Sequence, residues 1–226
     1  LKTKKCRVIT TLLQGSEPSG LIALHRWLTT RNVKELPNTN LRFIICSVEA
    51  ACVKPLLSKR FVDDSEDINR CFGNQEYDKI QIENQVGSYE RAQLIVQTIK
   101  DVNPEMVVDL HNAPSPCPTF AISTSITTET ISLASFFCQT LVLSDLELGS
   151  LMEQDFSCPS ITVECGGRFD EQAHEMAYAG ICHIATYEYI GYIQPETCIE
   201  VIYLPLRLQV SEGVHLSYAE HDEGYS

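Results

Sequence analysis

Several features that define common classes of protein are missing from this chain of 226 residues. No run approaches the ~20 apolar residues that a membrane-spanning helix needs, and the segment after the basic start is too short and polar for a signal peptide. Lys and Arg number 17 against 30 Asp and Glu, which gives a net charge of −13. Because a surface of that sign repels nucleic acid and anionic membranes, we expect neither as the main partner.

The motifs of the commonest hydrolases and nucleotide-binding enzymes are also absent. The sequence has no GxSxG elbow, no HExxH helix, no P-loop and no GxGxxG turn. Ten cysteines are present, but none forms a CxxC pair or has the close spacing of a zinc knuckle. We therefore expect free thiols and a cytoplasmic protein. A Cys–His nucleophile is conceivable, although the spacing singles out no particular thiol.

Composition and pattern predict an α/β domain with a sizeable core. Hydrophobic residues make up 44% of the chain and charged residues 21%, as in ordinary globular proteins. Strand-like apolar runs alternate with helical stretches, which is typical of a largely parallel sheet covered on both faces. The run at 41–47 is expected to be fully buried, as parallel strands are. We expect strands at 6–13, 41–47, 106–110, 120–123, 140–143 and 160–164, and helices at 19–30, 88–102 and 170–189.

The pattern of predicted secondary structure changes close to residue 194. Residues 1–193 form the predicted α/β domain, whereas residues 194–226 contain short β-like runs at 198–203 and 207–210, followed by a polar tail. A second, mostly β element therefore begins here and is not completed. We expect two parts, the second of them an incomplete C-terminal β element.

Side chains capable of chemistry fall where strands are expected to end. His111 follows a buried run and precedes a proline-rich stop, at the carboxyl end where open α/β sheets place their sites. Its imidazole can bind a metal, with Asp109 as an outer acceptor. Glu17 lies between the first strand and its helix, and Glu164 ends a later strand. The structural alternatives are a polar strand end for His111 and a helix cap for Glu17.

A long polar loop at 59–76 supplies basic and amide groups. Arg60 and Arg70 can hold an anion, with Asn69 beside them, or they can pair with the surrounding Asp and Glu. Glu17 and His111 would provide one oxygen and one nitrogen ligand to a metal, and Glu164 is a separate carboxylate. Together with the donors of the loop, they suit metal-assisted hydrolysis of an amide.

Five motifs occur in succession: Gln14-Gly-Ser-Glu17-Pro-Ser-Gly20, Asp67-Ile-Asn69-Arg70-Cys-Phe72, Ser88-Tyr-Glu-Arg-Ala92, Asp109-Leu-His111-Asn112 and Ile161-Thr-Val-Glu164-Cys-Gly. In this order they resemble the signatures of the succinylglutamate desuccinylase/aspartoacylase family, zinc-dependent amidohydrolases on the carboxypeptidase A fold. The resemblance covers roughly residues 6–192. It implies a three-layer α/β fold with a mixed, largely parallel sheet of the zinc-carboxypeptidase type.

The resemblance also implies a role for each catalytic candidate. Glu17 and His111 match two zinc ligands of the family. Glu164 matches the carboxylate that activates the zinc-bound water and then protonates the leaving amine. Arg60 resembles the arginine that polarises the scissile carbonyl and stabilises the oxyanion. These roles agree with the general chemistry of zinc, carboxylate bases and guanidinium groups.

Substrate binding is implied for a second set of residues. Asn69 and Arg70 match the pair that holds a substrate carboxylate, and Asn112 is a further candidate contact. The implied partner is a small molecule, an N-acyl amino acid or another carboxylate ligand. Self-association of the chain is left open by the sequence.

Three departures from the family pattern bear on these roles. The family's first zinc ligand is a His in a His-Gly-x-Glu turn, and this chain has Gln14 there. An amide is a poor zinc donor beside imidazole, so we expect Gln14 to complete the site weakly. Arg60 and Asn69 are further apart than in the family, as if two residues were inserted at Asp64-Ser65. The family's C-terminal β domain is also cut short here.

The sequence therefore predicts zinc-dependent hydrolysis of an N-acyl amino acid or a similar small carboxylate-bearing amide, with Zn²⁺ as cofactor. The presence of Glu164, His111 and the Asn–Arg pair favours this enzyme. Gln14 favours a competing class, a non-catalytic relative with a disabled metal site that binds a small carboxylate. A thiol hydrolase using Cys165 beside Glu164 is a third, remote alternative.

Overall fold

The computed structural model describes residues 5–30, 40–73, 86–191, 198–203 and 205. Its strands form one seven-stranded sheet in the order β2-β1-β3-β6-β4-β5-β7. Neighbouring strands are parallel except for the antiparallel pair β4 and β6. This arrangement confirms the predicted mixed, largely parallel sheet. The strands are β1 (Cys6–Thr11), β2 (Asn40–Ile45), β3 (Met106–Ala113), β4 (Phe120–Ser123), β5 (Thr140–Leu143), β6 (Ser160–Gly167) and β7 (Glu200–Tyr203).

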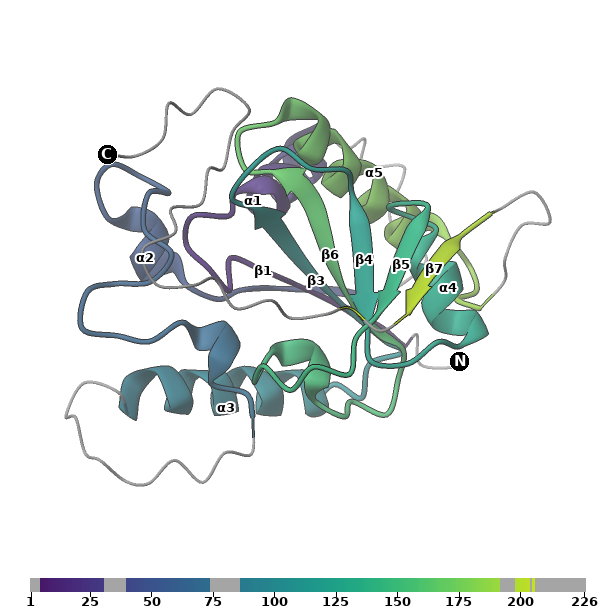
Figure 1. The fold of residues 1–226 in the computed structure, drawn as a ribbon, viewed down its shortest axis with the longest axis horizontal. Helices are drawn as coiled ribbons and strands as arrows, with labels where there is room; N and C mark the ends of the chain where they lie inside the picture. Colours follow the sequence, from purple (N-terminus) through teal and green to yellow (C-terminus); the bar gives the residue numbers. More distant parts are fainter. Residues whose placement is uncertain (1–4, 31–39, 74–85, 192–197, 204, 206–226) are drawn as a thin grey trace.

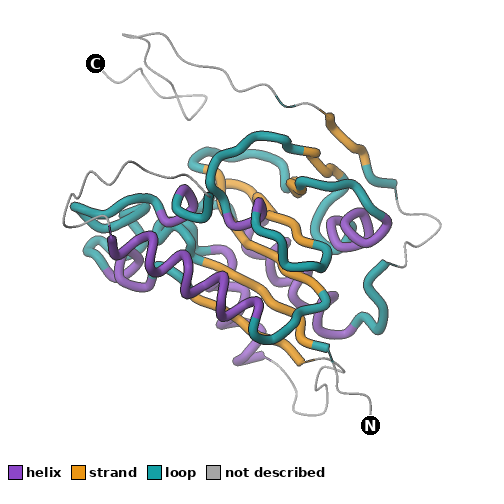
Figure 2. Tube along the Cα trace, turned by 90° about the horizontal axis from the view of Figure 1, so that it is seen from below, coloured by secondary structure: helices purple, strands orange, loops and turns teal. Residues whose placement is uncertain are grey.

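Helices cover both faces of the sheet, so that the domain has three layers (Figure 1). The helices α1 (Ser19–Thr30) and α5 (Glu171–Thr186) pack together on one face. On the other face lies α3 (Val86–Lys100), which Figure 2 shows in front of the strands. Shorter elements complete the chain: α2 (Val48–Cys52), α4 (Thr128–Ala134) and the 3₁₀ turns η1 (Ile68–Arg70) and η2 (Leu151–Glu153).

The alternation of side chains along β3 divides the core in two. Val108 and Leu110 pack with α1 and α5, whereas Val107 packs with α3. Because successive side chains of a strand point to opposite faces, Asp109 and His111 lie on the α3 face. The polar site residues of β3 therefore share a face with the α3 side of the core.

The prediction that the second strand is fully buried was wrong. Among the described strands, β2 pairs with β1 alone and forms one edge of the sheet. Its side chains are half-buried or exposed, and Ile45 is 39% exposed. An apolar run shows that a strand packs against something, but it does not tell an edge strand from a central one.

Several boundaries differ from the sequence predictions. β3 and β6 continue through the polar residues at their ends, to Ala113 and Gly167, and the short helix α2 was not predicted. β7 joins the main sheet beside β5. The predicted strand at 207–210 lies outside the described residues, and the division of the chain at residue 194 stays a prediction.

Two compositional expectations can be compared with the structure. All ten cysteines are free thiols, as predicted, and several lie in the core. Within the described ranges, the helices are too short or too polar to cross a membrane.

A buried arginine connects the first strand, β1, to the end of the last described helix, α5. Arg7 in β1 is 0% exposed and pairs with the carboxylate of Glu105. Its guanidinium also donates to the backbone oxygens of Ile184, Tyr187 and Glu188. These oxygens lie at the end of α5, where helix carbonyls lack partners within the helix. Arg7 therefore anchors the end of α5 against the central sheet.

Replacing Arg7 by Met is expected to lower the free energy of unfolding by about 3 kcal/mol, because Glu105 and the carbonyls of α5 lose their buried partner. Denaturant unfolding measures the change. The matched control is Arg91→Met, since Arg91 forms an exposed pair with Glu49 at 3.3 Å and such pairs contribute about 1 kcal/mol or less. Equal losses in the two variants would contradict this assignment.

Candidate metal and substrate site

The residues predicted for the site converge on one cavity of about 570 Å³ at the carboxyl ends of the central parallel strands. This is the position where open α/β sheets bind their ligands. The structure thus brings together residues that lie far apart in the sequence, while their individual roles stay predictions. The predicted residues that line the cavity are Gln14, Glu17, Arg60, Asn69, Arg70, His111, Asn112 and Glu164.

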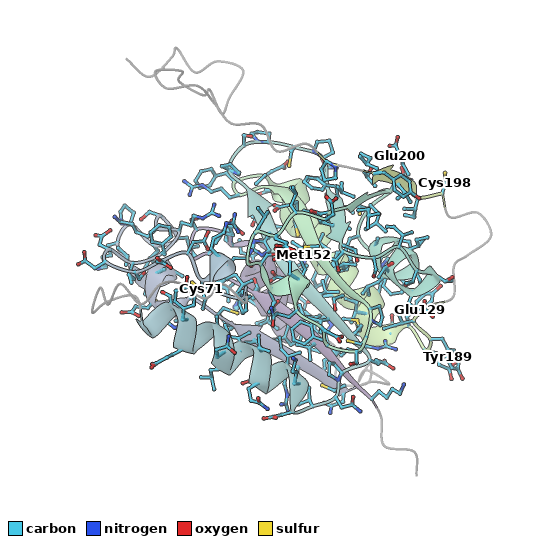
Figure 3. All side chains as sticks on the ribbon, turned by 60° about the horizontal axis from the view of Figure 1, so that its bottom comes forward. Cys71, Glu129, Met152, Tyr189, Cys198 and Glu200 are labelled. Carbon is cyan, nitrogen blue, oxygen red and sulfur yellow. The ribbon has the colours of Figure 1, made fainter. Side chains whose placement is uncertain are left out.

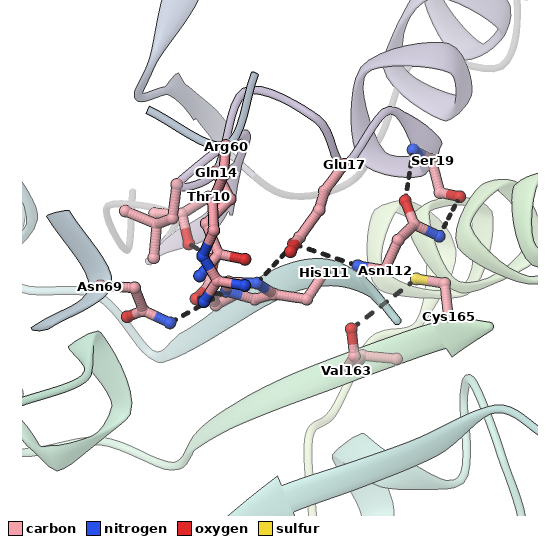
Figure 4. Close-up of polar contacts among 12 residues, drawn as sticks. Thr10, Gln14, Glu17, Ser19, Arg60, Asn69, His111, Asn112, Val163 and Cys165 are labelled. Carbon is pink, nitrogen blue, oxygen red and sulfur yellow. Dashed lines mark hydrogen bonds and ion pairs between the residues drawn. The ribbon is translucent and has the colours of Figure 1, made fainter. Parts of the chain in front are cut away.

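His111 lies between two carboxylates. Its Nδ1 is 2.7 Å from Oε2 of Glu17, and its Nε2 is 2.6 Å from Oδ2 of Asp109 (Figure 4). Burial lowers the pKa of His111, but the two carboxylates raise the pKa by more, so that the net pKa is well above its ordinary value. The two carboxylates therefore favour the protonated ring, and this part of the cavity stabilises a positive charge.

Glu17 is positioned by the turn that follows β1. Its Oε2 also accepts a hydrogen bond from the backbone N–H of Asn112 at 3.2 Å, so the carboxylate connects this turn to β3. The turn packs tightly against α2, because a Cβ on Gly15 would lie 2.6 Å from Ala50. In the described structure the carboxylate faces the cavity and β3, which distinguishes it from a simple helix cap.

Asp67 organises the opposite side of the cavity, and the sequence analysis did not assign it a role. Its Oδ2 accepts from Nε2 of Gln14 at 3.0 Å and from the guanidinium of Arg60 at 2.9 and 2.7 Å. Its Oδ1 accepts from the backbone N–H of Asn69 at 3.0 Å. Arg60 thus has the ionic partner that the structural alternative expected. Since the Gln14 amide donates to Asp67, its oxygen is the end that is left for a ligand.

Asn69 and Arg70 are held by the segment from Gly149 to Leu151, for which no structure was predicted. The side-chain oxygen of Asn69 accepts from the backbone N–H of Leu151 at 3.0 Å. Gly149 accepts from the N–H of Phe72 at 2.9 Å, and its φ of +72° suits glycine. The exposed side chain of Arg70 lines the cavity. The support of Asn69 and Arg70 by this segment could not be predicted from the sequence, because the contacts join segments about 80 residues apart.

The amide of Asn112 is fully engaged within the fold. It accepts from the N–H of Ser19 at 2.9 Å and donates to Oγ of Ser19 at 2.7 Å and to the carbonyl of Gly166 at 3.0 Å. These bonds tie α1 to β3 and β6, so Asn112 has a structural role whether or not it also contacts substrate. The histidines of α5 belong elsewhere: His174 contacts Ser19, and His183 contacts the carbonyl of Phe136.

Glu164 stands beside His111 on the neighbouring strand, since the two residues are register partners in β6 and β3. Its Oε2 is buried and has no hydrogen-bond partner in the described structure. Burial, with Glu17 and Asp109 adding to it, raises the pKa of Glu164, while His111 and Arg60 oppose the shift. A buried carboxylate with an unused oxygen suits a proton-transferring group.

Cys165 does not share this environment. Its side chain is part of the core cluster that includes residues of α5, on the opposite face of β6 from Glu164. Burial, with a contribution from Glu164, raises the pKa of the Cys165 thiol well above its ordinary value. Because the thiolate is the reactive form, this geometry disfavours the thiol hydrolase.

Glu17, His111 and Gln14 are the donors available to a metal ion. No group of three His, Cys, Asp or Glu suitable for a metal occurs in the part of the chain that the structure describes. The available set is one carboxylate, one imidazole and one amide oxygen, and Glu17 and His111 are in direct contact. Carboxylate and imidazole are ordinary zinc ligands, whereas an amide is a weaker third donor. The residues therefore fit a weakly bound divalent cation.

The chain was compared with known families, curated proteins and solved structures. Residues 8–182 match the family described as succinylglutamate desuccinylase/aspartoacylase catalytic domain. No curated protein matches the chain. Among solved structures, the succinylglutamate desuccinylase from Chromobacterium violaceum is similar with a TM-score of 0.70 and 14% identity, over 94% of this chain and 74% of that one.

Two further structures show the same fold. The succinylglutamate desuccinylase from Vibrio parahaemolyticus has a TM-score of 0.66 and 18% identity, over 87% of this chain and 61% of that one. The product-bound ectoine utilization protein EutE (DoeB) from Ruegeria pomeroyi has a TM-score of 0.64 and 16% identity, over 91% of this chain and 63% of that one. The chain thus spans less than two thirds of these two proteins.

In metal-free protein at pH 7, Glu164→Gln is expected to raise the melting temperature. The raised pKa means that the folded state binds this proton more tightly than the unfolded chain, so ionisation costs stability as pH rises through the folded pKa. The gain is therefore expected at neutral pH and should vanish below about pH 4, where both states are protonated. Each 1 kcal/mol corresponds to about 2–4 °C in a domain of this size.

Thermal unfolding between about pH 3 and pH 8 measures this difference. Glu90→Gln on the exposed side of α3 is the control, and it should change the melting temperature little at any pH. A Glu164→Gln protein that is equally or less stable than the wild type at pH 7 would contradict the buried, unpaired state of this carboxylate.

The support of Arg70 by its neighbouring loop can be tested with glycine variants. A Cβ at Gly149 would lie 2.5 Å from the backbone oxygen of Arg70, whereas a Cβ at Gly87 meets nothing within 4 Å. Gly149→Ala is expected to destabilise the protein by about 1–3 kcal/mol, and Gly87→Ala to leave it unchanged or slightly more stable. Chemical denaturation compares the two. Similar stabilities for the two variants would show that the loop does not pack on Arg70 as described.

Proposed function

The chain belongs to the succinylglutamate desuccinylase/aspartoacylase family, and from this premise we propose that it is a metal-dependent amidohydrolase. Its proposed substrate is an N-acyl amino acid or a similar small amide that carries a carboxylate. The observation that carries the proposal is the register between Glu164 and His111 on two neighbouring strands: Oε2 of Glu164 is buried without a hydrogen-bond partner in the described structure, and Glu164 and Arg70 both line the cavity. The free thiols are typical of a reducing compartment, so the proposed location is the cytoplasm.

Glu17, His111 and the amide oxygen of Gln14 would hold the metal, with zinc as the proposed ion. Bound there, a divalent cation supplies Lewis-acid activation of water and of the amide carbonyl. Asp67 orients Gln14 through its side-chain amide, and Asp109 orients His111. Outer partners of this kind fix the direction in which a ligand atom points.

Glu164 performs the proton transfers in the proposed reaction. Its carboxylate takes a proton from the attacking water and then delivers that proton to the nitrogen of the leaving amine. The raised pKa of Glu164 matches both steps, because a base that must later act as an acid works best when its pKa approaches the working pH. Arg60 would oppose the negative charge that develops on the carbonyl oxygen.

Asn69 and Arg70 orient the substrate. Arg70 offers a guanidinium to a carboxylate, and planar bidentate pairing of this kind fixes both position and angle. The side-chain nitrogen of Asn69 is 3.5 Å from Nε2 of His111, so the carboxylate site adjoins the metal ligands. A substrate held there presents its amide to Glu164.

Gln14 favours a second candidate, a non-catalytic relative that binds a small carboxylate. In this reading the cavity, Arg70 and Asn69 still recognise the ligand, but the metal is absent under cellular conditions. The two candidates differ in metal content and in turnover, and they agree on carboxylate binding.

Metal content of the wild type and of Gln14→His, after exposure to excess zinc and dialysis, separates these candidates. We expect the wild type to hold zinc, and Gln14→His to hold it at least tenfold more tightly, because imidazole is the stronger zinc donor. His183→Gln is the control, since His183 is exposed on α5 and does not line the cavity. Hydrolysis of N-acyl amino acids by each protein is followed in the same samples.

Stoichiometric zinc and turnover in the wild type would support the hydrolase. Zinc and turnover in Gln14→His alone would identify the wild type as the non-catalytic relative. Failure of both proteins to bind zinc would contradict the metal site itself.

A further inference from the structure

The cavity changes character beyond the catalytic carboxylate. Across the sheet, Glu164 of β6 is the register partner of Phe120 of β4. Two residues along the same strands, Thr162 pairs with Ile122, and Ile122 pairs with Val142 of β5. Side chains of paired residues lie on the same face of a sheet. The floor of the cavity therefore becomes apolar one strand away from Glu164.

The wall above this floor adds further apolar side chains, beside the polar residues Ser144, Ser150 and Glu153. The wall is formed by the segment that contains Gly149, which also packs against Arg70. Met152 belongs to this segment and is labelled near the centre of Figure 3. Apolar side chains from floor and wall enclose the same space: Phe120, Ile122, Val142, Leu146, Leu148 and Met152.

Charged groups in the cavity are unevenly distributed. Among the described lining residues, the basic side chains are Arg60, Arg70 and His111. Asp67 neutralises Arg60, and His111 lies between Glu17 and Asp109. Arg70 is thus the one guanidinium in this lining without a carboxylate partner in the described structure. Glu153 also lines the cavity. Its carboxylate accepts hydrogen bonds from the backbone N–H groups of Leu148, Gly149 and Ser150, and no cation pairs with it in the described structure, so it adds negative charge near the apolar side chains of the wall.

We propose that this site takes an N-acylated amino acid with a single carboxylate and an apolar group. The carboxylate pairs with Arg70, and the apolar group lies on the floor formed by Ile122 and Val142. A second carboxylate at that end would lose its water without gaining a cation from the described lining residues, which is costly. The volume of about 570 Å³ accommodates such a molecule, since small-molecule sites are commonly about 300–1,000 Å³. This inference rests on the proposed function, because it takes the cavity as the substrate site.

Two probes of equal length test the inference: N-hexanoylglycine and N-adipoylglycine, which differ only in a terminal methyl or carboxylate group. Equilibrium binding is measured by calorimetry with the full chain carrying Glu164→Gln, so that turnover does not interfere. We expect N-hexanoylglycine to bind at least tenfold more tightly. N-methylhexanamide, which has no carboxylate, should bind at least tenfold more weakly than N-hexanoylglycine.

Ile122→Thr tests the floor, and Ile45→Thr on the edge strand β2 is its control, because Ile45 does not line the cavity. Ile122→Thr should weaken binding of N-hexanoylglycine about three- to tenfold, from the loss of apolar contact. The control should leave binding unchanged. Both variants are checked for unchanged secondary structure by circular dichroism.

Equal or tighter binding of N-adipoylglycine would overturn the inference, as would equal binding of the neutral amide. Hydrolysis is measured separately with the zinc-loaded wild type. Selective binding of N-hexanoylglycine without hydrolysis would leave the inference standing and overturn the proposed hydrolase. Hydrolysis with a preference for N-adipoylglycine would support the proposed hydrolase and overturn the inference about the apolar group.

Discussion

The register between β3 and β6 is the constraint on which the candidate site depends. It sets His111 beside Glu164 on one face of the sheet, while Leu110 and Val163 face the core on the other. A slip of one residue would send one of the two polar side chains into that core. Packing of the apolar face against α1 and α5 therefore determines the positions of the His111 ring and the Glu164 carboxylate on the other face.

Around this pair, the carboxylates of the cavity form hydrogen bonds and ion pairs with neighbouring site residues. Asp109 and Glu17 hold the imidazole of His111, and Asp67 holds Gln14 and Arg60. Carboxylates outnumber cations near the proposed metal ligands, which favours a bound cation even though Gln14 is a weak donor. Further along the sheet the lining becomes more apolar, so the cavity has one end with charged side chains and another that is rich in hydrocarbon side chains.

The central strands could be predicted from the sequence, and so could the positions of the candidate site residues at strand ends, because strand ends and motifs carry local signals. His111, Glu17 and Glu164 each sit where a regular element stops. The exposure of β2, the hub at Asp67 and the loop through Gly149 could not be predicted in the same way. They depend on which strand has one neighbour and on hydrogen bonds between distant segments, and neither leaves a periodic pattern.

Anomalous X-ray diffraction from crystals soaked with zinc tests the central claim most directly, since it locates the metal without reference to activity. The account predicts an anomalous peak within coordination distance of Glu17 and His111, with the side-chain oxygen of Gln14 turned toward it. A peak bound by other residues, or crystals without a peak at saturating zinc, would contradict the claim that this cavity is a metal-dependent active site.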